Sequence, residues 1–390
     1  MRDYFFKNSP IRFRFPVDGD CVNCRDGKMD EDILLLPVVV ETETGCEILV
    51  NSIRAKEDTQ KGCYTAVVPI RGYRNTLLAE NKTDGTSCRI VIFRMPENSV
   101  GSFRLSSDDN VRFLKELNEK NYASIFEHPY LAVYKKAHDL YGAKVHLNLF
   151  YSFDDKARAC FSNEHSYFDL SMMTERYKDE FRANADWLKL TFHARSEFPE
   201  MPYKNTDSAT ILKDCIDVYR EIIRFAGEEC VSDSTTIHWG EVNREGVRAL
   251  RAIGFRSLTG YFTKDGNNNS IVSYYANEEL VDHIKHRDFW VDTEEDMIFG
   301  RIDCVLNIGT LEHVKATVED AASDPHRGGF VSIMIHEQYF YPDYSGYCPD
   351  FEERILVPCK YLYEHGYRGA HITEVTEERP LVKFHAFHAL

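Results

Sequence analysis

Two stretches of this chain decide its fold, Phe103-Arg104-Leu105-Ser106-Ser107-Asp108-Asp109-Asn110 and Val331-Ser332-Ile333-Met334-Ile335-His336-Glu337. The first is a strand-like run that ends in two carboxylates, and the second is a strand-like run that ends in His and Glu. In barrels of parallel strands, chemistry gathers where the strands end, because the loops there converge on one face. Carboxylates and histidines at such a face can hold a cation and move protons. The two stretches therefore predict an enzyme with a metal site.

Strand-like and helix-like segments alternate from about residue 101 onward. We expect strands at residues 103–107, 144–150, 187–192, 235–238, 255–259, 305–308 and 330–335. Helices are expected at residues 211–225 and 245–253, with a last helix before Gly366. Such alternation implies parallel strands joined by right-handed crossovers. The pattern predicts an α/β domain, a deformed (β/α) barrel, over residues 99–390.

The first hundred residues follow a different pattern. Short β-prone runs occur at residues 33–40, 46–50, 64–70, 76–80 and 88–93, separated by turns such as Asp84-Gly85. This spacing is typical of a β-sandwich, which we place at residues 1–98. The pattern resembles that of the small immunoglobulin-like modules that accompany carbohydrate enzymes. Residues 95–99 are expected to form the linker.

Composition limits the partners of this protein. The 390 residues contain 47 Lys and Arg against 63 Asp and Glu, a net charge of −16. Such a surface repels nucleic-acid backbones and anionic membranes but leaves neutral sugars unopposed, so we expect a carbohydrate substrate, no nucleic acid and no membrane. Eleven scattered cysteines and the lack of an apolar leader favour the cytoplasm. Oligomeric state stays open.

The order of the motifs resembles that of the polysaccharide deacetylase family, defined by NodB homology, over about residues 101–375. Those enzymes use a deformed barrel and a divalent metal, usually zinc, to remove acetyl groups from sugars. The resemblance implies that Asp108 is the general base and Asp109 a metal ligand, since the first family motif is a strand ending in two aspartates. It also implies that His336, at the end of an apolar strand, protonates the leaving group. Asp303 is a candidate for the acid that tunes this histidine.

The middle motifs depart from the family. Where the family has two histidines four residues apart, this chain has His193 and Glu197. Residues four apart share a face of a helical turn, so we expect both to bind the metal ion. A carboxylate in place of an imidazole suits zinc and suits manganese better. His238 follows the fourth expected strand, where the family normally carries Arg, Pro and Tyr, and the Arg that would orient the base is absent. We take His238 as a third or fourth ligand, or as a proton carrier.

Aromatic and basic side chains near these motifs are candidates for sugar contacts. We expect Trp239, Arg195, Tyr339 and Tyr341 to bind substrate, although packed aromatics would give the same pattern. A second Asp-Asp pair, Asp154-Asp155, is an alternative to the first. Asp108 could also simply cap the following helix.

The predicted function is that of a metal-dependent hydrolase that removes an N- or O-linked acetyl group from a sugar, with Zn²⁺ expected and Mn²⁺ possible. Two alternatives remain. One is a glycosidase on a related barrel, which would use its carboxylates as acid and nucleophile. The other is a carbohydrate-binding relative without catalysis.

Overall fold

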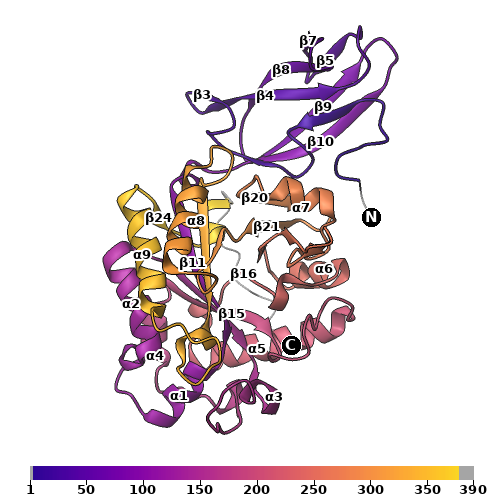
Figure 1. Ribbon diagram of the computed structural model, residues 1–390. Helices are drawn as coiled ribbons and strands as arrows, with labels where there is room; N and C mark the ends of the chain where they lie inside the picture. The colour runs from indigo at the N-terminus through magenta and orange to yellow at the C-terminus, as the bar shows by residue number, and fades with distance from the viewer. Residues whose placement is uncertain (1–2, 377–390) are drawn as a thin grey trace.

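The computed structural model describes residues 3–376 of the chain, as a β domain above a larger α/β domain (Figure 1). The β domain contains two five-stranded sheets. The first holds β1 (Arg12–Phe15), β3 (Lys28–Asp30), β4 (Ile33–Glu41), β7 (Lys56–Asp58) and β8 (Cys63–Ile70). The second holds β2 (Cys21–Val22), β5 (Ile48–Val50), β6 (Ile53–Arg54), β9 (Arg74–Asn81) and β10 (Ser87–Arg94).

Alternating burial explains why these strands form. In β4 and β8 every second side chain is buried, as expected for strands with one face on a core. Buried residues of both sheets, among them Leu36, Val68, Leu77 and Ile90, belong to one apolar cluster. All strand pairs are antiparallel except β2 with β10. The immunoglobulin-like character of this domain stays a prediction.

The β domain is attached to the larger domain through its residues 18–20. The backbone of Asp20 forms a β-bridge with Trp290, and the Val291 amide donates to the Gly19 carbonyl at 2.8 Å. Gly19 has a φ of +89°, and a Cβ here would lie 2.1 Å from the Val291 carbonyl oxygen, so only glycine fits this contact. The side chain of Asp20 is fully buried and binds His283 at 2.5 Å. Cys21, Phe93 and Met95 also form one buried apolar cluster with residues of the larger domain such as Phe289 and Phe330, so the two domains are joined through polar and apolar contacts.

Parallel strands form the centre of the larger domain. One sheet has the order β15 (Leu188–Ala194), β12 (Val145–Phe150), β11 (Ser102–Asn110), β23 (Phe330–His336) and β22 (Cys304–Val305), with β24 (Arg368–Gly369) also on β11. Every pairing in it is parallel. A second sheet has the order β16 (Ser234–Thr235), β17 (Ser257–Gly260), β21 (Met297–Arg301) and β20 (Phe289–Asp292). The mixed α/β fold with parallel strands is confirmed.

Closure into a barrel is not found in residues 3–376, where the paired strands of this domain form these separate sheets and two short hairpins. Their edges meet at isolated contacts, namely a bridge between Leu190 and Val231 and a hydrogen bond from the Ile302 amide to the Gly260 carbonyl. The expected strands are all present. Additional strands that we did not expect are the antiparallel pair β20–β21 and the hairpins β13 (Ser152–Phe153) with β14 (Phe168–Asp169) and β18 (Thr263–Lys264) with β19 (Ser270–Ile271).

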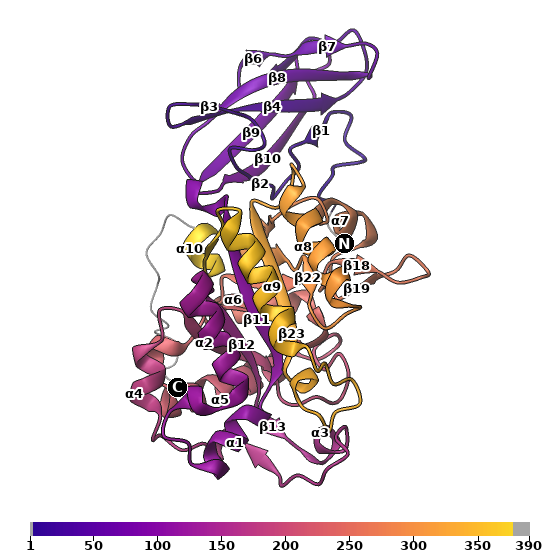
Figure 2. The same cartoon turned by 60° about the vertical axis from the view of Figure 1, so that its left-hand side comes forward.

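Helices cover the strands (Figure 2). The longer ones are α1 (Arg112–Lys120), α2 (Pro129–Tyr141), α5 (Ser208–Phe225), α6 (Arg244–Ala252), α8 (Leu311–Ser323) and α9 (Phe351–Glu364). The shorter ones are α3 (Asp155–Arg158), α4 (Lys178–Ala183), α7 (Glu278–Ile284) and α10 (Ile372–Thr376). Side-chain caps begin several of them: Asp207 accepts from the Thr210 amide at 2.9 Å, and Asn243 from the Gly246 amide at 2.9 Å. No helix within residues 3–376 is long and apolar enough to cross a membrane.

The carboxyl ends of β11, β12, β15 and β23 lie at the end of the larger domain that faces away from the β domain (Figures 1 and 2). The β domain instead contacts the opposite end, where β11 begins at Ser102. The face at which parallel strands concentrate their chemistry is thus left to the loops of the larger domain alone.

Candidate metal centre

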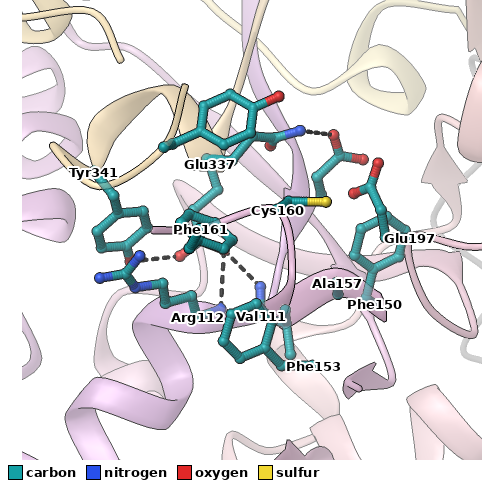
Figure 3. A pocket seen from close by; sticks show the side chains of 13 residues that line it. Val111, Arg112, Phe150, Phe153, Ala157, Cys160, Phe161, Glu197, Glu337 and Tyr341 are labelled. Carbon is teal, nitrogen blue, oxygen red and sulfur yellow. Dashed lines mark hydrogen bonds between the residues drawn. The ribbon is translucent and has the colours of Figure 1, made fainter. Parts of the chain in front are cut away.

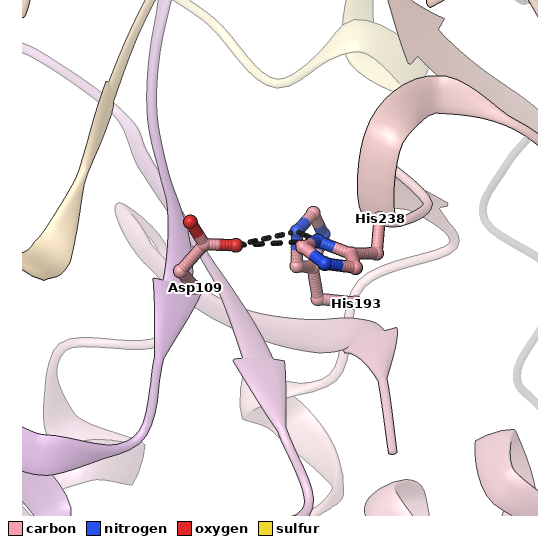
Figure 4. A group of neighbouring side chains, drawn as sticks. All are labelled: Asp109, His193 and His238. Atoms are coloured by element: carbon pink, nitrogen blue, oxygen red, sulfur yellow. Dashed lines mark hydrogen bonds and ion pairs between the residues drawn. The ribbon is translucent and has the colours of Figure 1, made fainter. Parts of the chain in front are cut away.

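Three buried side chains meet at the carboxyl ends of the strands: Asp109, His193 and His238 (Figure 4). His193 Nε2 lies 3.0 Å from Asp109 Oδ1 and 3.1 Å from His238 Nδ1. The third separation, between His238 Nδ1 and Asp109 Oδ1, is 3.4 Å. Among the described residues these three form the group of acids and histidines that could hold a metal ion. Sequence analysis predicted all three as ligands.

A local irregularity of the backbone places each of these side chains. Asp109 has a φ of +63°, and the register of β11 against β12 shifts between Ser107 and Asn110. The register of β12 against β15 shifts at His193, because Leu149 pairs with Phe192 but Phe150 pairs with Ala194. Strand bulges of this kind re-aim side chains and are common beside active sites. His238 lies in the 3-10 turn η5 (His238–Gly240), next to Trp239 with a φ of +62°.

The bulge at Asp109 also explains how two consecutive carboxylates reach one site. In a regular strand, Asp108 and Asp109 would point to opposite faces of the sheet. The left-handed backbone at Asp109, a conformation that Asp tolerates better than most residues, interrupts this alternation. Both carboxylates are buried at the same strand end.

Backbone carbonyls fix the protonation pattern of the two histidines. His193 Nδ1 lies 2.5 Å from the carbonyl oxygen of Thr236, and His238 Nε2 lies 3.0 Å from the carbonyl oxygen of Glu197. A carbonyl only accepts, so each of these nitrogens carries the hydrogen in the neutral ring. The opposite nitrogens, His193 Nε2 and His238 Nδ1, face Asp109. They donate to its carboxylate while the rings are protonated, and they would present lone pairs once a cation takes the place of those protons. This is the outer-shell arrangement that orients histidine ligands in metal sites.

The resulting donor set fits a divalent cation. Ligands of a tetrahedral site with bonds of about 2.1 Å lie roughly 3.4 Å from one another. The three separations of 3.0, 3.1 and 3.4 Å approach that value.

The electrostatics of the site also favour a bound cation. Burial opposes the charge on Asp109, but the hydrogen bonds from His193 and His238 hold its pKa well below the usual range. Burial likewise opposes a charge on His193, yet the charge of Asp108 and the hydrogen bond to Asp109 raise its pKa. The site therefore attracts positive charge.

Asp108 and His336 lie beside this group. They face each other across β11 and β23 in the strand register, which puts their side chains on the same face of the sheet. The Asn148 amide donates to Asp108 Oδ1. His336 Nδ1 lies 2.8 Å from Asn307 Oδ1, so Nδ1 carries a hydrogen and Nε2 is left for proton transfer.

Sequence analysis did not single out the four side chains that orient the site, Asn148, Asn307, Glu337 and Gln338. Gln338 Nε2 donates to Asp109 Oδ2 at 2.7 Å, which fixes the carboxylate that also meets both histidines. Glu337 accepts from the backbone amides of Val111, Arg112 and Phe113 at 2.6, 3.0 and 2.6 Å, so it caps α1 from the 3-10 turn η6 (Glu337–Phe340) that follows β23. Glu337 was visible only as the end of a strand motif, and an amide carries no sequence signal of its own.

Two predicted residues lie elsewhere than expected. The Glu197 carboxylate does not belong to the group of possible ligands; its backbone carbonyl reaches His238 instead. Residues 195–199 form a loop rather than the helical turn that would place side chains four apart on one face. Arg195 binds Asp217 at 2.8 Å, and its guanidinium lies 4.0 Å from the ring centre of Tyr151. Arg195 therefore contacts Asp217 and Tyr151, and it does not line the cavity described below.

The three aromatic residues that we expected to bind substrate differ in their burial and in their contacts. Tyr341 is buried and donates to Glu337 at 2.8 Å, and it lines the cavity described below. Tyr339 is half-buried, with its ring centre 5.9 Å from that of His336. Trp239 is 40% exposed beside His238, in a left-handed conformation that is rare for a bulky residue. Of these three, Trp239 is the most exposed, and Tyr341 is the one that lines the cavity.

The alternative acids have structural roles. Asp154 caps α3 by accepting from the Lys156 and Ala157 amides at 3.0 Å each. Asp303 accepts at 2.9 Å from the amide of Ser332, which lies near the start of β23, whereas His336 ends that strand, so Asp303 does not tune the histidine. Asn307 takes the position predicted for an acid.

A cavity opens directly beside Asp109 (Figure 3). Its polar lining includes Asp109, Glu197, Glu337 and Gln338, and its apolar and aromatic lining includes Val111, Phe150, Phe153, Ala157, Phe161 and Tyr341. The space for the centres of water molecules is about 40 Å³. Burial, together with the charge of Asp109, raises the pKa of Glu197 to about 8.

Comparisons with known proteins place few limits on function. No family model matches the chain, and no curated protein matches it. Among solved structures, one similar chain is a candidate alpha-galactosidase from Bacteroides fragilis NCTC 9343, with 12% identity, coverage of 93% of this chain and 80% of that chain, and a TM-score of 0.28. Similarity at that level carries no conclusion about this protein. The function has to be argued from the site.

Proposed function

We propose that this protein is a metal-dependent hydrolase that removes a short acyl group, most simply acetyl, from a carbohydrate. The observation that carries the proposal is the meeting of Asp109, His193 and His238 at 3.0 to 3.4 Å, with both histidines held in the tautomers that ligands need. We also propose that the chain is a divergent relative of the polysaccharide deacetylases and that its larger domain is a deformed version of their barrel.

Asp109 Oδ1, His193 Nε2 and His238 Nδ1 would hold the ion. An Asp, His, His set suits Zn²⁺, and Mn²⁺ is a second choice. When bound, such an ion supplies a Lewis acid that polarises a carbonyl and makes water a better nucleophile. Three protein ligands leave positions free for water and substrate, as in catalytic rather than structural zinc sites.

The chain's own residues handle the protons. Asp108 accepts a proton from the attacking water, and Asn148 holds its carboxylate in place. His336 takes up a proton at Nε2 from solvent and then, protonated on both ring nitrogens, delivers the Nε2 proton to the departing amine or alcohol, while Asn307 keeps the ring oriented by accepting from Nδ1. Because Asp108 and His336 lie opposite each other in the register, the two proton transfers take place at one site.

Two further observations support a sugar ester or amide as substrate. The apolar cavity next to Asp109 has room for a small acyl group, since about 40 Å³ of space for water centres corresponds to roughly three water molecules. Trp239, exposed beside His238, offers an aromatic face of the kind on which sugar rings pack.

The test is an assay of purified protein for metal content and for acetate release. We expect about one equivalent of zinc or manganese, and release of acetate from acetylated oligosaccharides that a chelator abolishes and Zn²⁺ restores. Asp108→Asn should abolish activity, whereas Asp154→Asn, which alters only the cap of α3, should retain it. Reducing ends released without acetate would replace the proposal with a glycosidase. Sugar binding without any hydrolysis would replace it with a binding protein.

A further inference from the structure

Phe161 is one of the aromatic residues that line the cavity beside Asp109 (Figure 3). Phe161 comes from the segment between α3 and β14, which is not one of the motifs that supply the metal site. Its ring, with those of Phe150 and Phe153, makes most of the apolar wall. Any acyl group whose carbonyl reaches the metal centre must place its hydrocarbon tail against this wall.

Phe161 is held on several sides. The Arg112 guanidinium lies 4.8 Å from its ring centre, and the rings of Tyr344 and Phe153 lie at 5.5 and 5.6 Å. Its backbone forms an antiparallel bridge with Tyr344, in the loop that follows β23. The bridge fixes the backbone at Phe161, and the ring cannot move aside without losing its contacts with Arg112, Tyr344 and Phe153.

Asp343 connects the two loops that meet at Phe161, namely the segment between α3 and β14 and the loop that follows β23. Its carboxylate accepts from Arg112 Nη1 at 2.8 Å and lies 2.7 Å from His165 Nε2. Its backbone carbonyl accepts from the Ser162 amide at 2.9 Å. The Asp343 side chain is 6% exposed, so these contacts are shielded from solvent. Arg112, which stacks on Phe161, is thus fixed by the same residue.

From this geometry we propose that Phe161 sets the acyl-chain length of the substrate, and that Asp343 is the positioning residue that keeps Phe161 in place. The inference rests on the proposed hydrolase and adds its specificity: acetyl groups fit, and chains of four or more carbons do not. A methylene that a hydrophobic pocket cannot accommodate changes selectivity by roughly 10- to 200-fold.

The experiment compares 4-nitrophenyl acetate, propionate, butyrate and hexanoate with zinc-loaded protein. We expect kcat/KM of the wild type to fall at least about tenfold from acetate to butyrate. Phe161→Ala should bring the two esters within about threefold, and Asp343→Asn should shift the ratio in the same direction by a smaller factor. Tyr167→Ala is the matched control: it removes an exposed aromatic ring of the same segment that does not line the cavity. Phe161→Val serves if the alanine variant does not fold.

A second measurement does not require turnover. Acetate and butyrate, the products, are titrated into zinc-loaded wild type and Phe161→Ala by calorimetry. We expect Phe161→Ala to gain affinity for butyrate relative to acetate by about tenfold. Equal selectivity in the wild type and the variant, in both assays, would overturn the inference while leaving the hydrolase intact. Absence of any hydrolysis would instead contradict the proposed function, and the carboxylate titration would still decide the role of Phe161.

Discussion

The buried carboxylate of Glu337 predicts an unusual dependence of stability on pH. Glu337 is fully buried, and it accepts from three backbone amides and from the Tyr341 hydroxyl at 2.8 Å. Burial disfavours the charge more than these donors favour it, and the pKa rises from 4.5 to about 7. The folded protein therefore binds this proton more tightly than the unfolded chain does.

The sign and size follow from proton linkage. Because the pKa of this acid is raised on folding, its contribution to stability is fully present below the unfolded pKa and is lost as pH rises toward 7. The shift from 4.5 to about 7 corresponds to about 3 kcal/mol at 1.36 kcal/mol per unit. Glu337→Gln has no such proton. Between pH 5 and pH 8 the wild type should therefore lose roughly 2 to 3 kcal/mol of unfolding free energy relative to the variant.

The assay is urea unfolding of both proteins at several pH values, followed by far-ultraviolet circular dichroism. Taking the difference between wild type and variant cancels the titration of all other groups that the substitution leaves alone. Glu364→Gln, a substitution of an exposed acid near the end of α9, is the matched control and should show a flat difference. A difference for Glu337→Gln that does not change with pH, or that grows in favour of the wild type as pH rises, would refute the reasoning.

Three further predictions concern the site. His193→Ala should weaken Zn²⁺ binding by at least about a hundredfold in calorimetric titration, whereas His313→Ala, on the exposed face of α8, should leave it unchanged; equal affinities would rule out His193 as a ligand. Asn307→Ala should lower kcat roughly 10- to 100-fold with little change in KM, because it releases the His336 ring, and a change confined to KM would contradict that role. Trp239→Ala should raise KM for acetylated oligosaccharides about three- to tenfold with kcat retained, and an unaltered KM would remove it from the substrate site.

Much of the fold could be predicted because strands and helices have their own periodicity. The parallel strands of the larger domain and the β-prone runs of the first hundred residues are present as expected. The antiparallel pair β20–β21 was missed because it is a short hairpin of strands with four and five residues, and it lacks the intervening helix on which the expected strand–helix alternation depends. The pairing of strands into two sheets depends on tertiary contacts that no local pattern encodes.

The candidate site likewise contains residues that the sequence could predict and residues that it could not. Asp109, His193 and His238 could be found because each follows a recognisable strand, and strand ends converge in space. Glu197 was misplaced because a four-residue spacing brings side chains together only on a helix, and this segment is a loop. Asn148 and Asn307 could not be anticipated, since their roles depend on the single neighbour each one meets in the folded protein.

The most direct test of the proposed metal site is a crystal structure of the zinc-soaked protein, with anomalous data collected at the zinc absorption edge. We expect one strong peak about 2.0 to 2.2 Å from Asp109 Oδ1, His193 Nε2 and His238 Nδ1. A peak at Asp154 and Asp155, or no peak near His193 at saturating zinc, would contradict the central claim that this trio holds a catalytic metal ion.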